Sequence, residues 1–191
     1  LLDYPAYTNN PDSLIYDEPK AMFAYSDAVN RSDRDFQFVR KLMNEGYYTE
    51  ALLEINRLQF FEDRADSELF VNKIICLRAL DMGEKAVFEY ETKLTDDVKN
   101  IPVLALQASL AYYDLNNYNQ SIETLDRIDT LHTEGNLLAK KYQLQALALA
   151  HQKDWGQSQR LFVKADEERS NKVLLDKNLQ ITQRAIDFDQ K

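Results

Sequence analysis

Glycine, cysteine and histidine are scarce in this chain of 191 residues, and their scarcity excludes several kinds of site. The chain contains four glycines, two histidines and one cysteine, Cys76. Four dispersed glycines provide no phosphate-cradling loop and no dinucleotide-binding fingerprint, and a single cysteine cannot form an internal disulfide. The histidines, His132 and His151, have no metal-ligand spacing with each other or with Cys76. We therefore expect no metal, no cofactor and no catalytic residues, and we predict that the protein is not an enzyme.

Positive charge and long apolar runs are lacking as well. The formal net charge is −9, and no run of Lys and Arg provides the basic surface that nucleic acids and anionic membranes attract. The most apolar stretch, at 101–113, is shorter than the ~20 residues of a membrane-spanning helix. Hydrophobic residues nevertheless make up 45% of the chain, which is enough for a folded core. The expected partner is a protein or peptide, a second copy of the chain included, with no nucleic acid and no membrane-spanning segment.

One pattern recurs along the middle of the chain. The segments 45–58, 116–128 and 153–165 each contain an aromatic residue, a small residue three positions later and an apolar residue four positions after that. The small residues are spaced 35, 35 and 37 positions apart, and large residues four positions later and nine positions earlier keep the same spacing. The small residues are Ala51, Ala86, Ser121 and Ser158; the later residues are Ile55, Tyr90, Leu125 and Phe162; the earlier ones are Leu42, Leu77, Tyr112 and Leu149.

Each period contains two helical patterns separated by a turn. In the third copy, apolar residues at helical spacing follow Pro102, a favourable first residue of a helix. Asn116 and Asn117 then break the pattern, and a second amphipathic stretch follows, with Leu125 on its apolar side. Gly135 is expected in the longer loop that absorbs the two extra residues of the last period. The pattern predicts an all-α fold built from helix pairs.

A helix–turn–helix period near 34 residues resembles the tetratricopeptide repeat of bacterial proteins. The family places a second small residue on the first helix of each pair. Ser109 and Ala146 meet that requirement, whereas Val39 and Ile74 are larger, and the turn aromatic of the second copy is replaced by Gly83. The repeats are thus partly degenerate. The resemblance implies an α-solenoid with a partly extended N-terminal extension at 1–31, four helix pairs at 32–172 and a C-terminal capping helix at 173–191.

The resemblance also implies a binding site on the concave face, lined by the first helix of each pair. The family's grip on acidic C-terminal tails is not expected, because Phe36 and Arg40 replace its Lys and Asn. The predicted groove is mostly apolar in its middle, which marks either a binding surface or the core of a tightly wound short solenoid. The predicted partner-binding residues are Phe36, Arg40, Met43, Val71, Ile75, Arg78, Leu106, Leu110, Tyr113, Gln143, Leu147 and His151.

These observations predict a non-enzymatic scaffold that binds a peptide, a helix or a partner subunit, with cell-envelope assembly as one setting of such bacterial proteins. A regulatory or accessory domain of a larger enzyme or assembly is the alternative, and an acidic chain argues against an RNA-binding repeat protein. The first residue is Leu rather than Met and the first segment is rich in Tyr and Asn. Both features favour a periplasmic or membrane-anchored location outside the cytoplasm over a cytoplasmic one.

Two finer hypotheses remain open. Residues 1–18 carry seven large apolar side chains, so we expect them to fold back onto the solenoid rather than extend into solvent. His151 and Asp114 align on adjacent repeats, and they form either a proton-transfer couple or an ordinary surface hydrogen bond, of which we favour the second.

Overall fold

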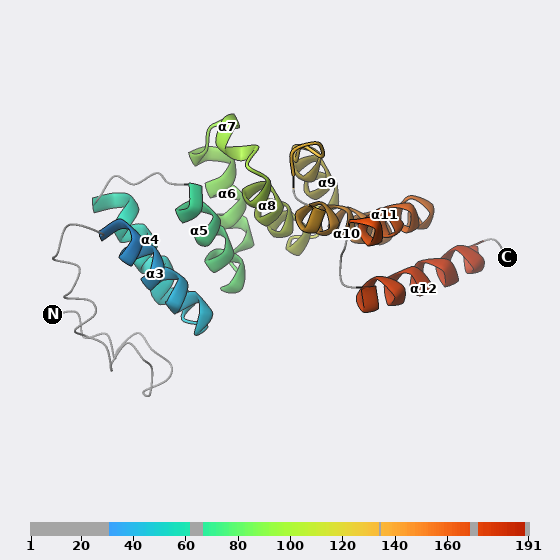
Figure 1. Ribbon diagram of the computed structural model, residues 1–191, viewed down its shortest axis with the longest axis horizontal. Helices are drawn as coiled ribbons and strands as arrows, with labels where there is room; N and C mark the ends of the chain where they lie inside the picture. Colours follow the sequence, from blue (N-terminus) through green and yellow to red (C-terminus); the bar gives the residue numbers. More distant parts are fainter. Residues whose placement is uncertain (1–30, 62–66, 134, 169–171, 190–191) are drawn as a thin grey trace. The chain divides into compact units, whose positions relative to one another are not determined.

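The structure is a computed structural model that describes residues 31–61, 67–133, 135–168 and 172–189 (Figure 1). Within these ranges all regular secondary structure is helical, which confirms the predicted all-α class. The chain divides into two compact units, residues 1–82 and 83–191. The predicted extension and the predicted docking of residues 1–18 lie outside the described residues, apart from Arg31, which begins the first described helix.

The first unit contains three described helices, α3 (Arg31–Asn44), α4 (Tyr48–Phe61) and α5 (Ser67–Ala79). Gly46 makes the turn between α3 and α4 with φ of 82°, a left-handed conformation that glycine adopts without steric cost. Helix α4 packs against both α3 and α5. The shared core consists of Val39, Leu42, Ala51, Ile55, Leu58, Leu69 and Cys76.

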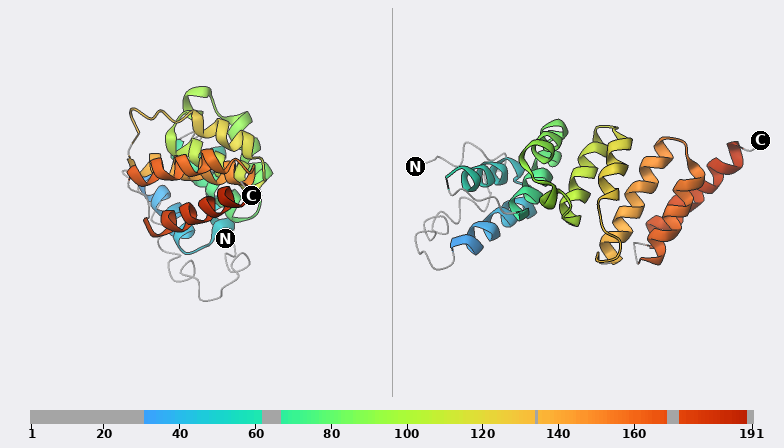
Figure 2. Two further views of the ribbon diagram at one scale, coloured as in Figure 1. Left: turned by 90° about the vertical axis from the view of Figure 1, so that its right-hand side faces the viewer. Right: turned by 90° about the horizontal axis from the view of Figure 1, so that it is seen from above.

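The second unit contains seven described helices that pack mainly on their neighbours in the chain (Figure 2). Helix α8 packs against α6 and α9, α10 against α9 and α11, and α12 against α11. Pro102 is the first residue of α8, as predicted. The helices are α6 (Gly83–Lys93), α7 (Asp96–Lys99), α8 (Pro102–Asp114), α9 (Tyr118–Asp126), α10 (Gly135–His151), α11 (Trp155–Glu167) and α12 (Lys172–Asp189).

All the small residues that recur along the chain are buried, and the two serines lie where helices cross. Ala51, Ala86, Ser121 and Ser158 are each fully buried. Ser109 Oγ donates to the carbonyl oxygen of Ser121 and lies 2.9 Å from Ser121 Oγ. Ser158 Oγ donates to the Ala146 carbonyl at 2.8 Å. The prediction that Ser121 and Ser158 pack between helices is therefore confirmed, and their hydroxyls are satisfied within the crossing.

Several details differ from the sequence-based expectations. The short helix α7 was not predicted, although Thr95 followed by two aspartates is a common start of a helix. Gly135 does not lie in the longer loop but is the first residue of α10. The terminal helix begins at Lys172, one residue before the predicted boundary. The boundary between the units falls inside the second, degenerate copy, between Met82 and Gly83.

The missing aromatic of that copy has a structural explanation. A Cβ atom built on Gly83 would lie 3.2 Å from Leu115 Cδ2. Leu115, the residue that follows α8, therefore lies beside Gly83, and its exposed side chain would have to shift by a few tenths of an ångström to make room for a side chain at residue 83. In the described part of the chain, no helix is both long enough and apolar enough to cross a membrane.

Candidate functional site

The twelve predicted partner-binding residues fall on four helices, two in each unit. We call those on α3 and α5 the first-unit set and those on α8 and α10 the second-unit set. Spacings of three or four residues place each helix's members on one side of that helix. The first-unit set is Phe36, Arg40, Met43, Val71, Ile75 and Arg78; the second-unit set is Leu106, Leu110, Tyr113, Gln143, Leu147 and His151.

The first-unit set is partly core and partly charged surface. Phe36 and Met43 are half-buried and pack against the buried core of their unit. Arg40 is exposed, and its guanidinium pairs with Glu68 of α5, so an ion pair links α3 and α5. Such exposed ion pairs add little stability, usually below ~1 kcal/mol. The first-unit set consequently offers a mixed surface rather than a purely apolar one.

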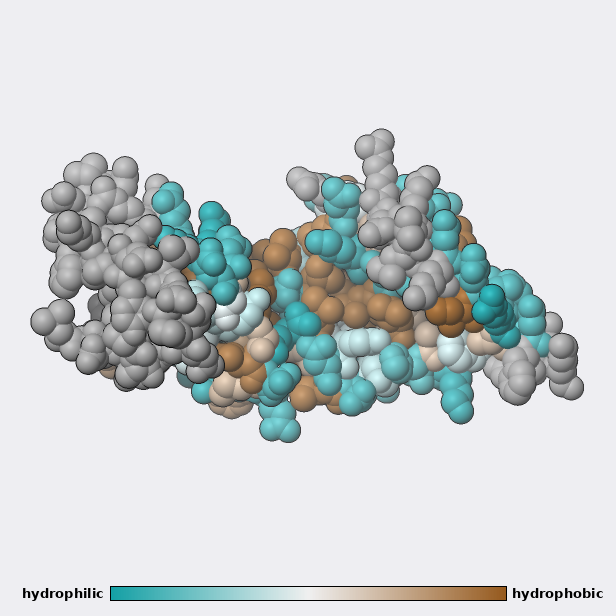
Figure 3. Space-filling model, turned by 90° about the horizontal axis from the view of Figure 1, so that it is seen from below, coloured by the Kyte–Doolittle hydropathy of each residue, from teal (hydrophilic) through white to brown (hydrophobic). Residues whose placement is uncertain are grey.

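The second-unit set is uncharged in its middle and only partly buried. Leu106 is 5% exposed and belongs to the core. Leu110 and Tyr113 pack against the same core but are only partly buried, and Leu147 is partly buried beside the core of α10 and α11. Figure 3 shows apolar surface, drawn in brown, with polar residues beside it. Each of the two sequence-based interpretations, core or binding surface, therefore applies to part of this set. Leu106 belongs to the core, whereas its neighbours retain accessible apolar surface.

Three aromatic rings meet at the turn end of the second-unit set. The Tyr118 ring, at the start of α9, stacks on the His151 ring with centroids 4.7 Å apart and planes 8° apart. The Tyr113 ring meets both edge-on, at 5.4 Å from Tyr118 and 5.5 Å from His151. We call Tyr113, Tyr118 and His151 the three-ring cluster. It joins two predicted binding residues to Tyr118, which the sequence identified only as a turn aromatic.

Comparison with known protein families and with curated protein sequences finds no match for this chain. Its function is therefore inferred from the geometry of its side chains.

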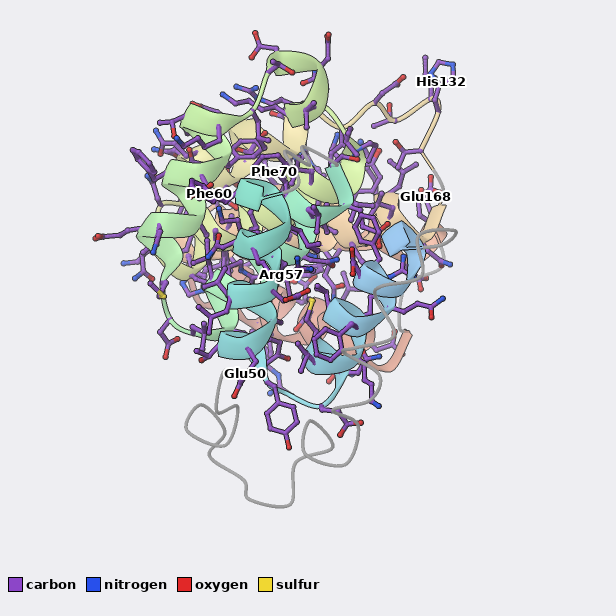
Figure 4. All side chains as sticks on the ribbon, turned by 90° about the vertical axis from the view of Figure 1, so that its left-hand side faces the viewer. Glu50, Arg57, Phe60, Phe70, His132 and Glu168 are labelled. Atoms are coloured by element: carbon purple, nitrogen blue, oxygen red, sulfur yellow. The ribbon has the colours of Figure 1, made fainter. Side chains whose placement is uncertain are left out.

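Among the described residues, no three His, Cys, Asp or Glu side chains gather as metal ligands would. His132 is 83% exposed on the loop before α10, with Nδ1 2.5 Å from Asp129 Oδ2 (Figure 4). Cys76 is buried, and burial raises the pKa of its thiol to about 12, which makes it a poor nucleophile.

A polar cluster that the sequence did not reveal joins α6, α7 and α8. Tyr112 donates to Glu91 Oε1 at 2.6 Å, and Lys99 Nζ lies 3.1 Å from Glu91 Oε2. Lys99 also donates to the Glu91 carbonyl, while the Tyr90 hydroxyl donates to the Lys99 carbonyl. Burial acts to raise the pKa of Glu91, but the hydrogen bonds from Tyr112 and Lys99 lower it below its ordinary value. Each member bonds another, so this cluster fixes the position of α7 rather than forming a site.

Charged residues also lie inside the first unit, a feature that the sequence analysis did not identify. Asp35 is fully buried and Glu54 is 7% exposed. Arg57 Nη2 lies 2.7 Å from Glu54 Oε1 and 3.9 Å from Asp35 Oδ1, and Figure 4 shows it on α4. The guanidinium offsets the cost of burying these carboxylates, so we assign Arg57 a structural role.

Proposed function

We propose that the protein is a non-enzymatic scaffold, a tetratricopeptide-like α-solenoid that binds an apolar α-helix or peptide segment on the second-unit set. The observation that carries the proposal is the uncharged surface that Leu110, Tyr113 and Leu147, all partly buried, leave accessible on one side of α8 and α10. Surface of this kind is a common mark of protein-binding sites. Assembly of the cell envelope is one setting for such a scaffold.

The order of helix packing supports the solenoid. In the second unit, α8 and α9 form one pair, α10 and α11 the next, and α12 packs on the last of them. Repeats of this kind bury their apolar faces only against their neighbours, and the terminal repeat needs a cover. We propose that α12 is that cover.

The second-unit set fits a partner helix for a geometric reason. Leu110 and Leu147 occupy equivalent places on neighbouring helices, with Tyr113 one turn further along α8. A helix with apolar residues at i, i+3, i+4 and i+7 presents a stripe that packs against such a row. Complete burial of a leucine contributes about 1.5–3 kcal/mol, and about a third or less of each side chain remains exposed, so covering that remainder contributes at most about 0.5–1 kcal/mol each. A sum of a few such contributions suits a reversible complex.

The proposal is tested with synthetic helical peptides that carry a leucine stripe, compared with scrambled peptides of the same composition. Binding to the intact chain is measured by fluorescence anisotropy. The double variant Leu110→Asp, Leu147→Asp should weaken stripe binding about tenfold or more, since charge replaces apolar contact at two places. Val163→Asp is the matched control, because Val163 is an apolar residue of α11 that is 46% exposed and lies outside the set.

Two results would contradict the proposal. One is equal affinity for striped and scrambled peptides. The other is equal weakening by the double variant and by Val163→Asp. Far-UV circular dichroism of every variant shows whether the helices are intact, so that loss of binding is not mistaken for unfolding.

A further inference from the structure

We propose that the three-ring cluster is a recognition site for an arginine side chain, carried by the segment that the scaffold binds. This inference rests on the proposed function, and it assigns a chemical class to one end of the second-unit set. The partner would combine an apolar stripe with an arginine placed next to the turns that follow α8 and α10.

The rings are held in place by the turns around them. The Tyr118 hydroxyl donates to Asn116 Oδ1 at 2.7 Å, and Asn116 itself has a left-handed backbone with φ of 59°. Gln152 Nε2 donates to Asn119 Oδ1 at 2.7 Å, which ties the turn after α10 to the start of α9. A ring pair held in this way loses little conformational freedom when a ligand arrives, and pre-organisation of this kind favours binding.

The most accessible part of the cluster is the exposed His151 ring, whereas the Tyr113 and Tyr118 rings are partly buried. The Tyr118 hydroxyl is already occupied by Asn116. Aromatic ring faces carry a partial negative charge and attract cations that approach within about 6 Å of the centroid. The chemistry offered by the cluster is therefore attraction of a cation.

Arginine matches this chemistry better than lysine. A guanidinium group is planar, so it can lie parallel to a stacked pair of rings, and it is more weakly hydrated than an ammonium group. The second unit already contains contacts in which a lysine ammonium group lies over a tyrosine ring. Lys99 Nζ lies 5.6 Å from the Tyr90 ring centroid, and Lys164 Nζ lies 5.7 Å from the Tyr142 ring centroid.

The charges near the cluster also favour a cation. Asp114 is exposed and follows Tyr113 directly, and Asp154 follows His151 by three positions. The Asp154 carboxylate caps α11 by accepting from Gln157 N and Gln157 Nε2, so Asp114 is the acidic residue that contributes most directly beside Tyr113. The chain as a whole has a formal net charge of −9, which attracts a basic partner at longer range.

The first experiment uses no partner peptide. Arginine capped at both ends is titrated into the intact chain at mildly alkaline pH, and the His151 ring resonances are followed by NMR. Capped citrulline is the matched probe, because it has nearly the same shape without the charge. We expect larger, saturable shifts with capped arginine than with capped citrulline. Equal responses to the two probes would overturn the proposal.

Two variants of one residue then separate the ring from its hydroxyl. Tyr118→Phe keeps the ring and should keep the preference for capped arginine, because the hydroxyl binds Asn116 rather than the ligand. Tyr118→Leu removes the stacked ring and should abolish the preference. The same preference in Tyr118→Leu as in the unmodified chain would show that the response arises elsewhere, which also overturns the proposal.

A final comparison separates this inference from the proposed function. Stripe peptides carrying arginine or citrulline at one end are compared on the intact chain, and arginine should improve affinity about two- to fivefold. Binding of both peptides with equal affinity would refute the arginine site while the scaffold proposal stands. Binding of neither peptide, together with an arginine-specific NMR response, would refute peptide binding on the second-unit set and support the arginine site.

Discussion

Replacing Ser121 with leucine tests the packing register on which the whole interpretation of the chain rests. Ser121 is fully buried at the crossing of α8 and α9, and its Oγ lies 2.9 Å from Ser109 Oγ. A leucine side chain adds methylene and methyl groups where no space remains. Overpacking of this kind typically costs about 1–3 kcal/mol, because neighbouring side chains leave their preferred rotamers.

The loss of the Ser121 hydroxyl itself contributes less. Ser109 Oγ also donates to the Ser121 carbonyl oxygen, and that bond does not depend on the side chain of residue 121. The smaller variant Ser121→Ala should therefore cost only about 0.5–1.5 kcal/mol, the usual net value of one hydrogen bond. The difference between the alanine and leucine variants isolates the steric part of the effect.

Thermal unfolding followed by circular dichroism measures both variants. For a chain of this length, each kcal/mol lowers the melting temperature by about 2–4 °C, so Ser121→Leu should lower it by roughly 2–12 °C. Glu123→Leu is the matched control, because Glu123 lies on the same helix but is exposed, and surface changes usually stay within about 0.5 kcal/mol. Equal melting temperatures for Ser121→Leu and Glu123→Leu would refute the register.

Three further predictions concern other described residues. Burial acts to raise the pKa of Glu91, but the hydrogen bond from Tyr112 helps to hold that pKa below 4.5 in the folded state. The ionised Glu91 carboxylate therefore stabilises the fold fully above pH 4.5. This contribution is lost as the pH falls through the folded-state pKa. Glu91→Gln should then flatten the dependence of the unfolding free energy on acid pH in urea titrations, and an unchanged slope would contradict this. Gly83→Tyr should lower the melting temperature by displacing Leu115, and Leu115→Ala should restore part of the loss; simple additivity would refute the contact. Native Cys76 should react with a thiol reagent far more slowly than free cysteine, because it is buried and its pKa is about 12; equal rates would show that it is accessible.

Much of the fold could be predicted from the sequence because its main constraints are local or periodic. Helical spacing of apolar residues identified the helices, and Pro102 marked where one begins. The recurring small residues identified the crossings, since a close approach of two helices excludes a large side chain wherever it occurs along the chain. Ser121 and Ser158 were placed correctly on that ground alone.

The candidate site was only partly predictable for the same reason. The family resemblance and the helical period selected Leu110, Tyr113, Leu147 and His151 as members of one surface. They could not show how much of each side chain is covered, because burial depends on the helices that pack from other parts of the chain. Leu106 lies on the same side of α8 as the partly buried Leu110 and Tyr113, yet it is core.

Contacts between different repeats were decided by the tertiary structure. Tyr118 and His151 are 33 positions apart, and their stacking depends on how α9 and the end of α10 approach one another. The bond between Tyr112 and Glu91, and the place of Leu115 beside Gly83, likewise join separate copies of the pattern. The repeat period in the sequence shows which residues are equivalent. It does not show which side chains meet across two copies, because those contacts depend on the distance and angle between packed helices. That distance and angle are set only when the chain folds.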